Sequence, residues 1–251
     1  MTKVGEDLNK IGIQFGMMWN PIVPMLSQVL SNPGSDWEAY PIPSIDGQPA
    51  KAATAAPVVR FLAVRKGYEH PEAAVKIYNL NFENLWSPNA QPDVYGTTLD
   101  GTEALHYTLM LAEPPFKNNN VHLKVTEALR TGDTSKLNRE MQITLSDIQA
   151  YQNGDMNKWP GEKIFGENGS QAVLNQYLVN GNLMPNAFYG ASTDTMAERS
   201  ASLEKLMVEV FTKIIMGDPI DSFDKFVEDW KKLGGDDITR EVNEWRAGLT
   251  G

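Results

Sequence analysis

The sequence predicts an α/β or α+β fold with few strands and many helices. Residues 11–19 alternate between apolar side chains and polar side chains or glycine, which is the period of a strand with one face in the core. Residues 58–64 form a nearly continuous apolar run, typical of a strand buried on both faces. The C-terminal third repeats its apolar residues at helical spacing instead. Two or three strands cannot easily cover so many helices, so we expect the sheets to be completed by segments that this chain lacks.

Size and composition indicate a soluble globular protein. The chain has 251 residues, of which 41% are hydrophobic and 22% charged, so it can bury a core and is not typical of a disordered protein. The net charge of −10, without a basic cluster, argues against nucleic acid as a partner. The absence of cysteine excludes disulfides, thiolate nucleophiles and zinc–sulfur sites. Neither a signal peptide nor a membrane-spanning apolar run is recognisable in the sequence.

Regular elements follow one another along the first half of the chain. The spacing predicts a short helix over 24–30, an extended segment over 37–43 and a linker over 43–49. A helix with one apolar stripe is expected over 70–86. Residues 87–120 read mostly as loop, with a strand around 105–111.

Helices dominate the second half. They are expected over 121–130, 137–152 and 169–179, each closed by a turn that contains glycine. An irregular aromatic loop over 183–190 precedes a long helix that Thr193 or Asp194 caps and Gly217 ends. A helix capped by Asp221 or Ser222 and a last helix over 237–246 complete the chain.

No motif of enzymatic or metal chemistry stands out. Phosphate-binding and dinucleotide-binding glycine loops, the hydrolase nucleophile motif and the zinc-protease motif are all missing. The three histidines, His70, His106 and His122, are scattered, and we read each as a cap, a loop residue or a surface position. Residues 153–157 begin like a calcium loop, but Ile164 stands where the last acidic ligand is required, which favours a helix-ending turn. We therefore expect neither a metal nor a cofactor.

Aromatic side chains in loops are the remaining functional signal. Saccharide sites combine an aromatic platform with fixed polar groups, and Trp19 beside Asn20 at the end of a strand fits this description. Tyr189, with Phe188, could provide a second wall, and Thr193 a hydroxyl. For Trp19 the pattern leaves ligand contact and core packing equally open, and for Tyr189 it favours packing. The other tryptophans that we assign to the core are Trp37, Trp86, Trp230 and Trp245.

Several segments, in their order and spacing, resemble one family. They are residues 10–19 (KIGIQFGMMW), 37–43 (WEAYPIP), 46–49 (DGQP), 66–73 (KGYEHPEA), 188–196, 211–217, 223–227 and 238–245 (ITREVNEW). Together they are similar to the extracellular solute-binding lipoproteins of carbohydrate ABC importers, especially the large Gram-positive type with a maltose-binding-like fold.

The resemblance implies a type II periplasmic-binding-protein fold with two lobes and a hinge. Residues 1–43 would supply a strand and crossover of the C-terminal lobe, 44–110 a return through the N-terminal lobe, and 111–251 the helical remainder of the C-terminal lobe. It also implies a carbohydrate ligand, an oligosaccharide or sugar acid, bound by lobe closure, and transfer to permease subunits in the membrane by a monomeric receptor. Trp19 and Tyr189, with Asn20 and Thr193 as neighbours, would line the cleft.

The family also defines what we expect to be missing. Its members are roughly twice as long and carry an export signal and a lipid-modified cysteine, so the chain is expected to correspond to the C-terminal half of an extracellular, membrane-anchored receptor. Two alternatives stay open. One is a carbohydrate-active hydrolase with paired carboxylates, whose spacing is set only in three dimensions. The other is a receptor fragment that binds nothing.

Overall fold

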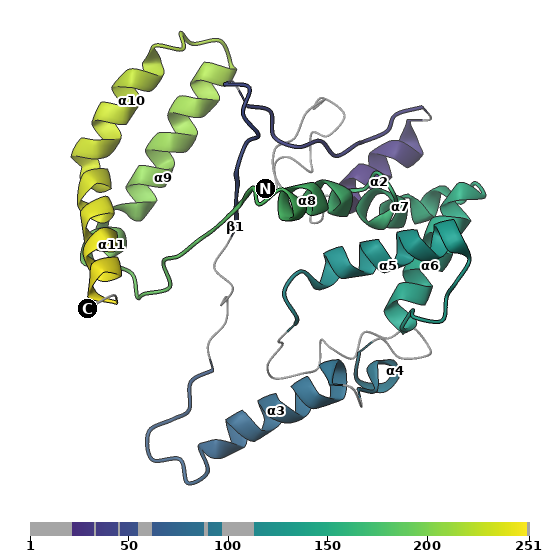
Figure 1. Cartoon of the computed structure of the whole chain (residues 1–251). Coiled ribbons are helices and arrows are strands. Elements are labelled where there is room, and N and C mark those ends of the chain that lie inside the picture. Colours follow the sequence, from purple (N-terminus) through teal and green to yellow (C-terminus); the bar gives the residue numbers. More distant parts are fainter. Residues whose placement is uncertain are drawn as a thin grey trace. The chain divides into compact units, whose positions relative to one another are not determined.

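Helices make up most of the part of the chain that the structure describes (Figure 1). A computed structural model describes residues 22–32, 34–44, 46–54, 62–87, 90–96 and 113–249. The helices in these ranges are α2 (Ile22–Ser31), α3 (Glu72–Trp86), α4 (Pro92–Tyr95), α5 (Lys117–Thr131), α6 (Arg139–Gln152), α7 (Trp159–Phe165), α8 (Ser170–Val179), α9 (Asp194–Ile215), α10 (Ser222–Trp230) and α11 (Asp236–Gly248), with a 3-10 turn η3 (Met156–Lys158) and a π-helical turn η4 (Lys231–Gly235).

One small parallel sheet accompanies these helices. It joins β1 (Ala52–Thr54) and β2 (Leu183–Pro185). The Ala52 amide donates to the carbonyl of Asn182 at 2.9 Å and the Asn186 amide to the carbonyl of Thr54 at 3.2 Å, so both strands run in the same direction. The prediction of a helix-rich chain with few strands is confirmed in this coarse form.

The individual strand predictions fare less well. Those over 11–19 and 105–111 lie outside the described residues. The prediction of a buried strand over 58–64 is wrong for its described end, because Leu62 and Val64 are exposed and form no strand. An apolar run becomes a buried strand only where neighbouring strands pair with it, and no described strand does so here. Conversely, the loop expected over 183–190 contains β2.

The helix predictions are confirmed, with ends that move by a few residues. They are the helices expected over 24–30, 70–86, 121–130, 137–152, 169–179 and 237–246, and those starting after Thr193 and Asp221. Helix α7 was not predicted. Pro160 lies in its first turn, where a proline costs no hydrogen bond. The turn that we expected at 153–157 is present, and the Asp155 carboxylate accepts from the Asn157 amide at 3.1 Å.

The described residues divide into two compact units, those from 22 to 53 together with those from 62 to 184, and residue 54 together with 185–249. The core of the first unit lies among α2, α5, α6 and α7. Its centre is Trp159, which is fully buried, together with Ile148 and Val125. Trp37 only packs against this core as a half-buried residue, so the core prediction for it is right in part.

An acidic residue anchors this core. Asp36 accepts hydrogen bonds from the Trp159 indole at 2.7 Å, from Lys163 Nζ at 2.6 Å and from the backbone amide of Trp37 at 2.8 Å. Partial burial raises the pKa of Asp36, but the hydrogen bonds from Lys163, Trp159 and Trp37 outweigh burial and leave that pKa below its usual value. The bonds thus favour the charged carboxylate.

The second unit is a helical hairpin followed by α11. Phe211 of α9 lies 6.0 Å from Phe223 and 5.3 Å from Phe226 of α10, measured between ring centroids, and these rings join the two helices. The chain then continues through η4 to Gly234, whose backbone is not helical, so the helix breaks there before α11 begins, as the two glycines at 234–235 predict. Gly234, at φ +126°, makes this change of direction possible, since other residues rarely adopt such a φ.

Two further expectations concern single side chains. Trp86, Trp230 and Trp245 are half-buried, so they are not full core residues. His122 was expected as a cap, loop or surface residue, and this prediction was wrong, since it is a buried residue of α5. Its ring contacts the carbonyl of Phe165, which lies 43 positions later in the sequence and is not visible from the residues around His122.

Candidate functional site

The predicted site residues fall into two groups. Trp19 and Asn20 lie outside the described residues. Tyr189 and Thr193 both belong to the second unit, where they precede the first residue of α9. The geometry around these two residues therefore defines the candidate site.

Tyr189 is held by a tryptophan of α11. Its ring centroid lies 4.9 Å from that of Trp245 at an interplanar angle of 84°, and Phe188 contacts the same indole at 4.9 Å and 74°. Both are edge-on arrangements, which aromatic pairs prefer. Directly after Tyr189 the backbone passes so close to Trp245 that a Cβ on Gly190 would lie 2.7 Å from the indole Nε1. A glycine is thus required where the loop crosses the indole.

The Tyr189 side chain nevertheless stays available to a ligand. It is 64% exposed, although its ring touches Trp245. The packing that we expected for Tyr189 exists, but it fixes the ring without covering it. An aromatic ring held in place by another ring and open to solvent has the properties of a stacking platform.

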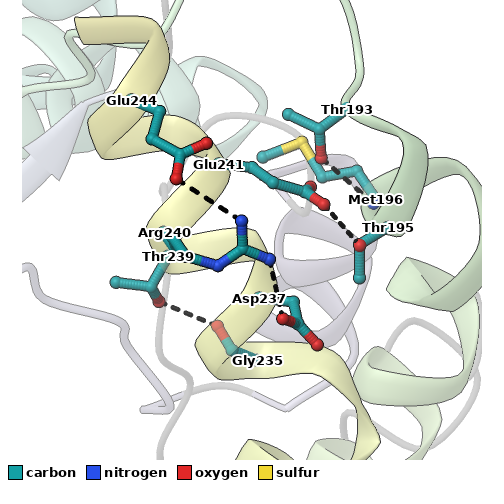
Figure 2. A network of polar contacts seen from close by, with 9 residues as sticks. All are labelled: Thr193, Thr195, Met196, Gly235, Asp237, Thr239, Arg240, Glu241 and Glu244. Atoms are coloured by element: carbon teal, nitrogen blue, oxygen red, sulfur yellow. Dashed lines mark hydrogen bonds and ion pairs between the residues drawn. The ribbon is translucent and has the colours of Figure 1, made fainter. Parts of the chain in front are cut away.

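Thr193 has a structural task. Its Oγ1 accepts a hydrogen bond from the backbone amide of Met196 at 3.2 Å, so Thr193, rather than Asp194, is the N-cap of α9 (Figure 2). One of the two predicted capping residues is therefore confirmed. Because this oxygen is already engaged, its capacity to contact a ligand is reduced.

Glu241 of α11 joins the same cluster. Thr195 Oγ1 donates to Glu241 Oε1 at 2.6 Å, and in Figure 2 the carboxylate points at the first turn of α9. Hydrogen bonding by Thr193 and by Thr195 lowers the pKa of Glu241, against a smaller opposing effect of desolvation. The carboxylate is therefore charged at neutral pH and acts as a hydrogen-bond acceptor.

Further charges surround this carboxylate. Arg240 contacts Asp237 at 2.9 Å and Glu244 at 3.4 Å, and all three side chains are exposed (Figure 2). The two acids against one base leave this part of α11 with an excess of negative charge. Asp237 and Glu244 thus offer exposed carboxylate oxygens on the helix that carries Trp245.

Such a combination suits a neutral polyhydroxylated ligand. The aromatic ring can contact the C–H face of a sugar, and the carboxylates can accept hydrogen bonds from its hydroxyl groups. Metal binding has no comparable support, since no group of three or more histidine, aspartate or glutamate side chains in the described ranges is placed to hold an ion.

Sequence reasoning missed two members of this cluster. Trp245 was assigned to the core, and Glu241 was not considered. Their spacing of four residues puts both on one face of α11, which was a usable signal. What the sequence did not reveal was that this face meets the loop that carries Tyr189.

The chain matches no family model, no curated protein and no solved structure. In addition, no helix in the described part of the chain is long and apolar enough to cross a membrane.

Proposed function

We propose that this chain is part of the substrate-binding component of a carbohydrate ABC importer, a receptor that closes its two lobes around a sugar and passes it to a permease. The observation that carries the proposal is the exposed Tyr189 ring, fixed by Trp245 of α11, the helix that also carries the exposed carboxylates of Asp237 and Glu244. The resemblance of the segments around 188–196 and 238–245 to this receptor family gives independent support.

The charges of the cluster favour a neutral oligosaccharide over a sugar acid. Glu241 is ionised, and Asp237 and Glu244 together outnumber Arg240. A ligand carboxylate brought to this surface would be repelled, whereas hydroxyl groups can donate to these oxygens. We therefore narrow the expected ligand class to uncharged sugars with several hydroxyl groups.

Exposed apolar side chains support the idea that the chain belongs to a larger receptor. On α3, Val75, Leu80 and Phe82 are all exposed, and they do not lie on one face. A helix with apolar residues around its circumference is normally covered on more than one side. Additional lobe segments would provide that cover.

Calorimetric titration tests the function. Maltotriose serves as the neutral probe and digalacturonate as the acidic one, each against the full chain. Tyr189→Ala should weaken maltotriose binding about five- to tenfold, because it removes the aromatic contact, and Tyr189→Phe should retain most of the affinity. Tyr68→Ala, which truncates another exposed tyrosine, is the matched control and should bind like the parent.

Three results would count against the proposal. The first is a chain that is folded by circular dichroism and gives no heat with either saccharide. The second is an equal effect of Tyr189→Ala and Tyr68→Ala. The third is turnover of a chromogenic glycoside, which would favour the hydrolase alternative.

A further inference from the structure

An apolar surface lies on the second unit, along the half of α9 that is farthest from Thr193. Val208, Phe211 and Ile215 follow one another at spacings of three and four residues, which places them on one stripe of the helix. All three side chains are exposed, Ile215 to 81%. The stripe is therefore an apolar helix face that the described residues leave open.

The stripe extends from α9 onto the turn and onto α10, which packs beside α9 (Figure 1). The Phe211 ring stacks on Phe223 of α10, with centroids 6.0 Å apart and an interplanar angle of 9°, and both rings stay partly exposed. Met216 and Ile220 of the turn between the helices are exposed as well. Exposed apolar side chains that gather in this way mark an interaction site. We call this set the hairpin surface: Val208, Phe211, Ile215, Met216, Ile220 and Phe223.

Three aspartates accompany one end of the hairpin surface. Asp218 and Asp221 lie in the turn between the helices, and Asp224 lies in the first turn of α10. None of them forms a salt bridge with a base in the part of the chain that the structure describes. This end of the surface therefore keeps negative charges that no salt bridge compensates.

The lysines of the hairpin are engaged with other acids. Lys213 Nζ lies 2.7 Å from Glu209 Oε1, and Lys225 bonds to Asp229. The hydrogen bond and charge of Lys213 and, less strongly, the charge of Lys205 lower the pKa of Glu209. Since Lys205, Glu209 and Lys213 are spaced by four residues, they form a row on another side of α9 than the apolar stripe.

One more carboxylate stands at the opposite end of the stripe. Glu204 precedes Val208 by four residues, is exposed and forms no salt bridge with another described side chain. It lies eleven positions before Ile215, which corresponds to about 16 Å of helix. The hairpin surface is thus bounded by negative charge at both ends, with apolar side chains between them.

We propose that the hairpin surface binds an amphipathic helix of a partner protein, whose apolar side chains cover the stripe and whose lysine or arginine side chains meet the carboxylates at both ends. A helix with basic residues about eleven positions apart, and apolar residues at helical spacing between them, has the complementary pattern. The inference does not rest on the sugar proposal, because Tyr189 takes no part in it.

The same charges disfavour two other occupants. If α9 paired with a second copy of itself in antiparallel direction about Phe211, Glu204 would meet Asp218, since each lies seven residues from the centre. An anionic lipid surface would be repelled by the aspartates of the turn.

Fluorescence anisotropy of a labelled peptide, titrated with the full chain, tests the proposal. The probe is a helical peptide of about 15 residues, with leucines at helical spacing and lysines near both ends. The matched peptide carries glutamates in place of the lysines. We expect the lysine peptide to bind at least about tenfold more tightly at low salt, and this preference to shrink at high salt. Equal affinities, or no binding of the lysine peptide up to about 1 mM, would overturn the proposal.

Apolar variants separate the hairpin surface from general attraction to an acidic protein. Ile215→Ser removes exposed apolar surface that the peptide would bury, and should weaken binding of the lysine peptide about five- to twentyfold with an unchanged circular dichroism spectrum. Val179→Ser changes a similarly exposed residue of the first unit and should bind like the parent. An equal effect of both variants would refute the site.

A charge variant tests the acidic end. Asp218→Asn should weaken binding of the lysine peptide about two- to fivefold, the range of an exposed ion pair. Glu69→Gln removes an exposed charge of the first unit and should leave the affinity unchanged. Unchanged affinity in Asp218→Asn, or the same loss in Glu69→Gln, would contradict the charge pattern that selects the partner.

Two measurements on the chain alone address the other occupants. Sedimentation velocity should show a monomer, and phosphatidylcholine vesicles should not retain the chain. A dimer that Ile215→Ser dissociates would show that the hairpin surface pairs with a second copy. Vesicle binding that Ile215→Ser abolishes would show that it contacts lipid. Either result would overturn the proposal of a partner helix.

Discussion

Replacing Trp159 by phenylalanine tests the description of the first unit's core. The indole is fully buried, and its Nε1 donates to Asp36 Oδ1 at 2.7 Å. Losing a hydrogen bond to a charged group costs about 1.5–3 kcal/mol. The smaller ring also leaves a cavity, and about 1–2 kcal/mol is a reasonable share of the ~3–5 kcal/mol that a full tryptophan-to-alanine truncation costs. Trp159→Phe should therefore lower the free energy of unfolding by about 2.5–5 kcal/mol.

Native-state hydrogen exchange measures this loss in the correct unit. The amides of Val125 and Ile148 belong to fully buried residues of the same core, so their exchange reports on its opening. Trp230→Phe alters a tryptophan of the other unit and should leave both amides unchanged. In a double-mutant cycle with Asp36→Asn, the effect of Trp159→Phe should shrink, because the two residues are coupled. A loss below about 1 kcal/mol, or strict additivity in the cycle, would refute the reasoning.

Three further outcomes follow from single contacts. Because the pKa of Asp36 is lowered in the fold, its charged form stabilises the folded protein above the unfolded pKa, near pH 4, and this stabilisation is lost as the pH falls through the folded pKa. When stability is measured against pH in the acid range, Asp36→Asn should lose stability less steeply than the parent. An identical slope would contradict the assignment. Gly190→Ala forces a Cβ against Trp245 and should cost about 1–3 kcal/mol of stability in the second unit, measured by urea unfolding, whereas an unchanged midpoint would mean that the loop does not pass over the indole. Thr193→Ala removes the cap of α9 and should cost about 1 kcal/mol in the same assay, while Thr193→Ser should behave like the parent if capping is the role of this residue.

Helix positions could be predicted because their signals are local. The cap of α9 needs only Thr193 and an amide three residues later, and Asn138 caps α6 in the same way. Burial and side-chain pairing depend instead on residues that are far apart in the sequence. Asp36 meets Trp159 across 123 positions, and His122 meets Phe165 across 43, so no window of sequence contains either pair.

In the candidate site, too, only the residues with a local sequence signal could be predicted. Tyr189 was found because a loop tyrosine between glycine and proline is visible locally. Its contact with Trp245, and that of Thr195 with Glu241 across 46 positions, required the fold. The local loop sequence therefore identified the aromatic residue, but not the side chain that holds it.

Helix α3 shows what periodicity leaves open, and it yields one more prediction. Its predicted apolar stripe includes Phe82 and Leu85, yet Phe82 is 44% exposed and Leu85 only 6%. Since the chain has no cysteine, single cysteines report accessibility without background. Phe82→Cys should react with a thiol reagent at least about tenfold faster than Leu85→Cys. Equal rates would contradict the described α3.

Protection of Phe82→Cys when the remaining lobes of a receptor are supplied would show that the stripe is a docking face, whereas unchanged reactivity would remove this support for a larger receptor.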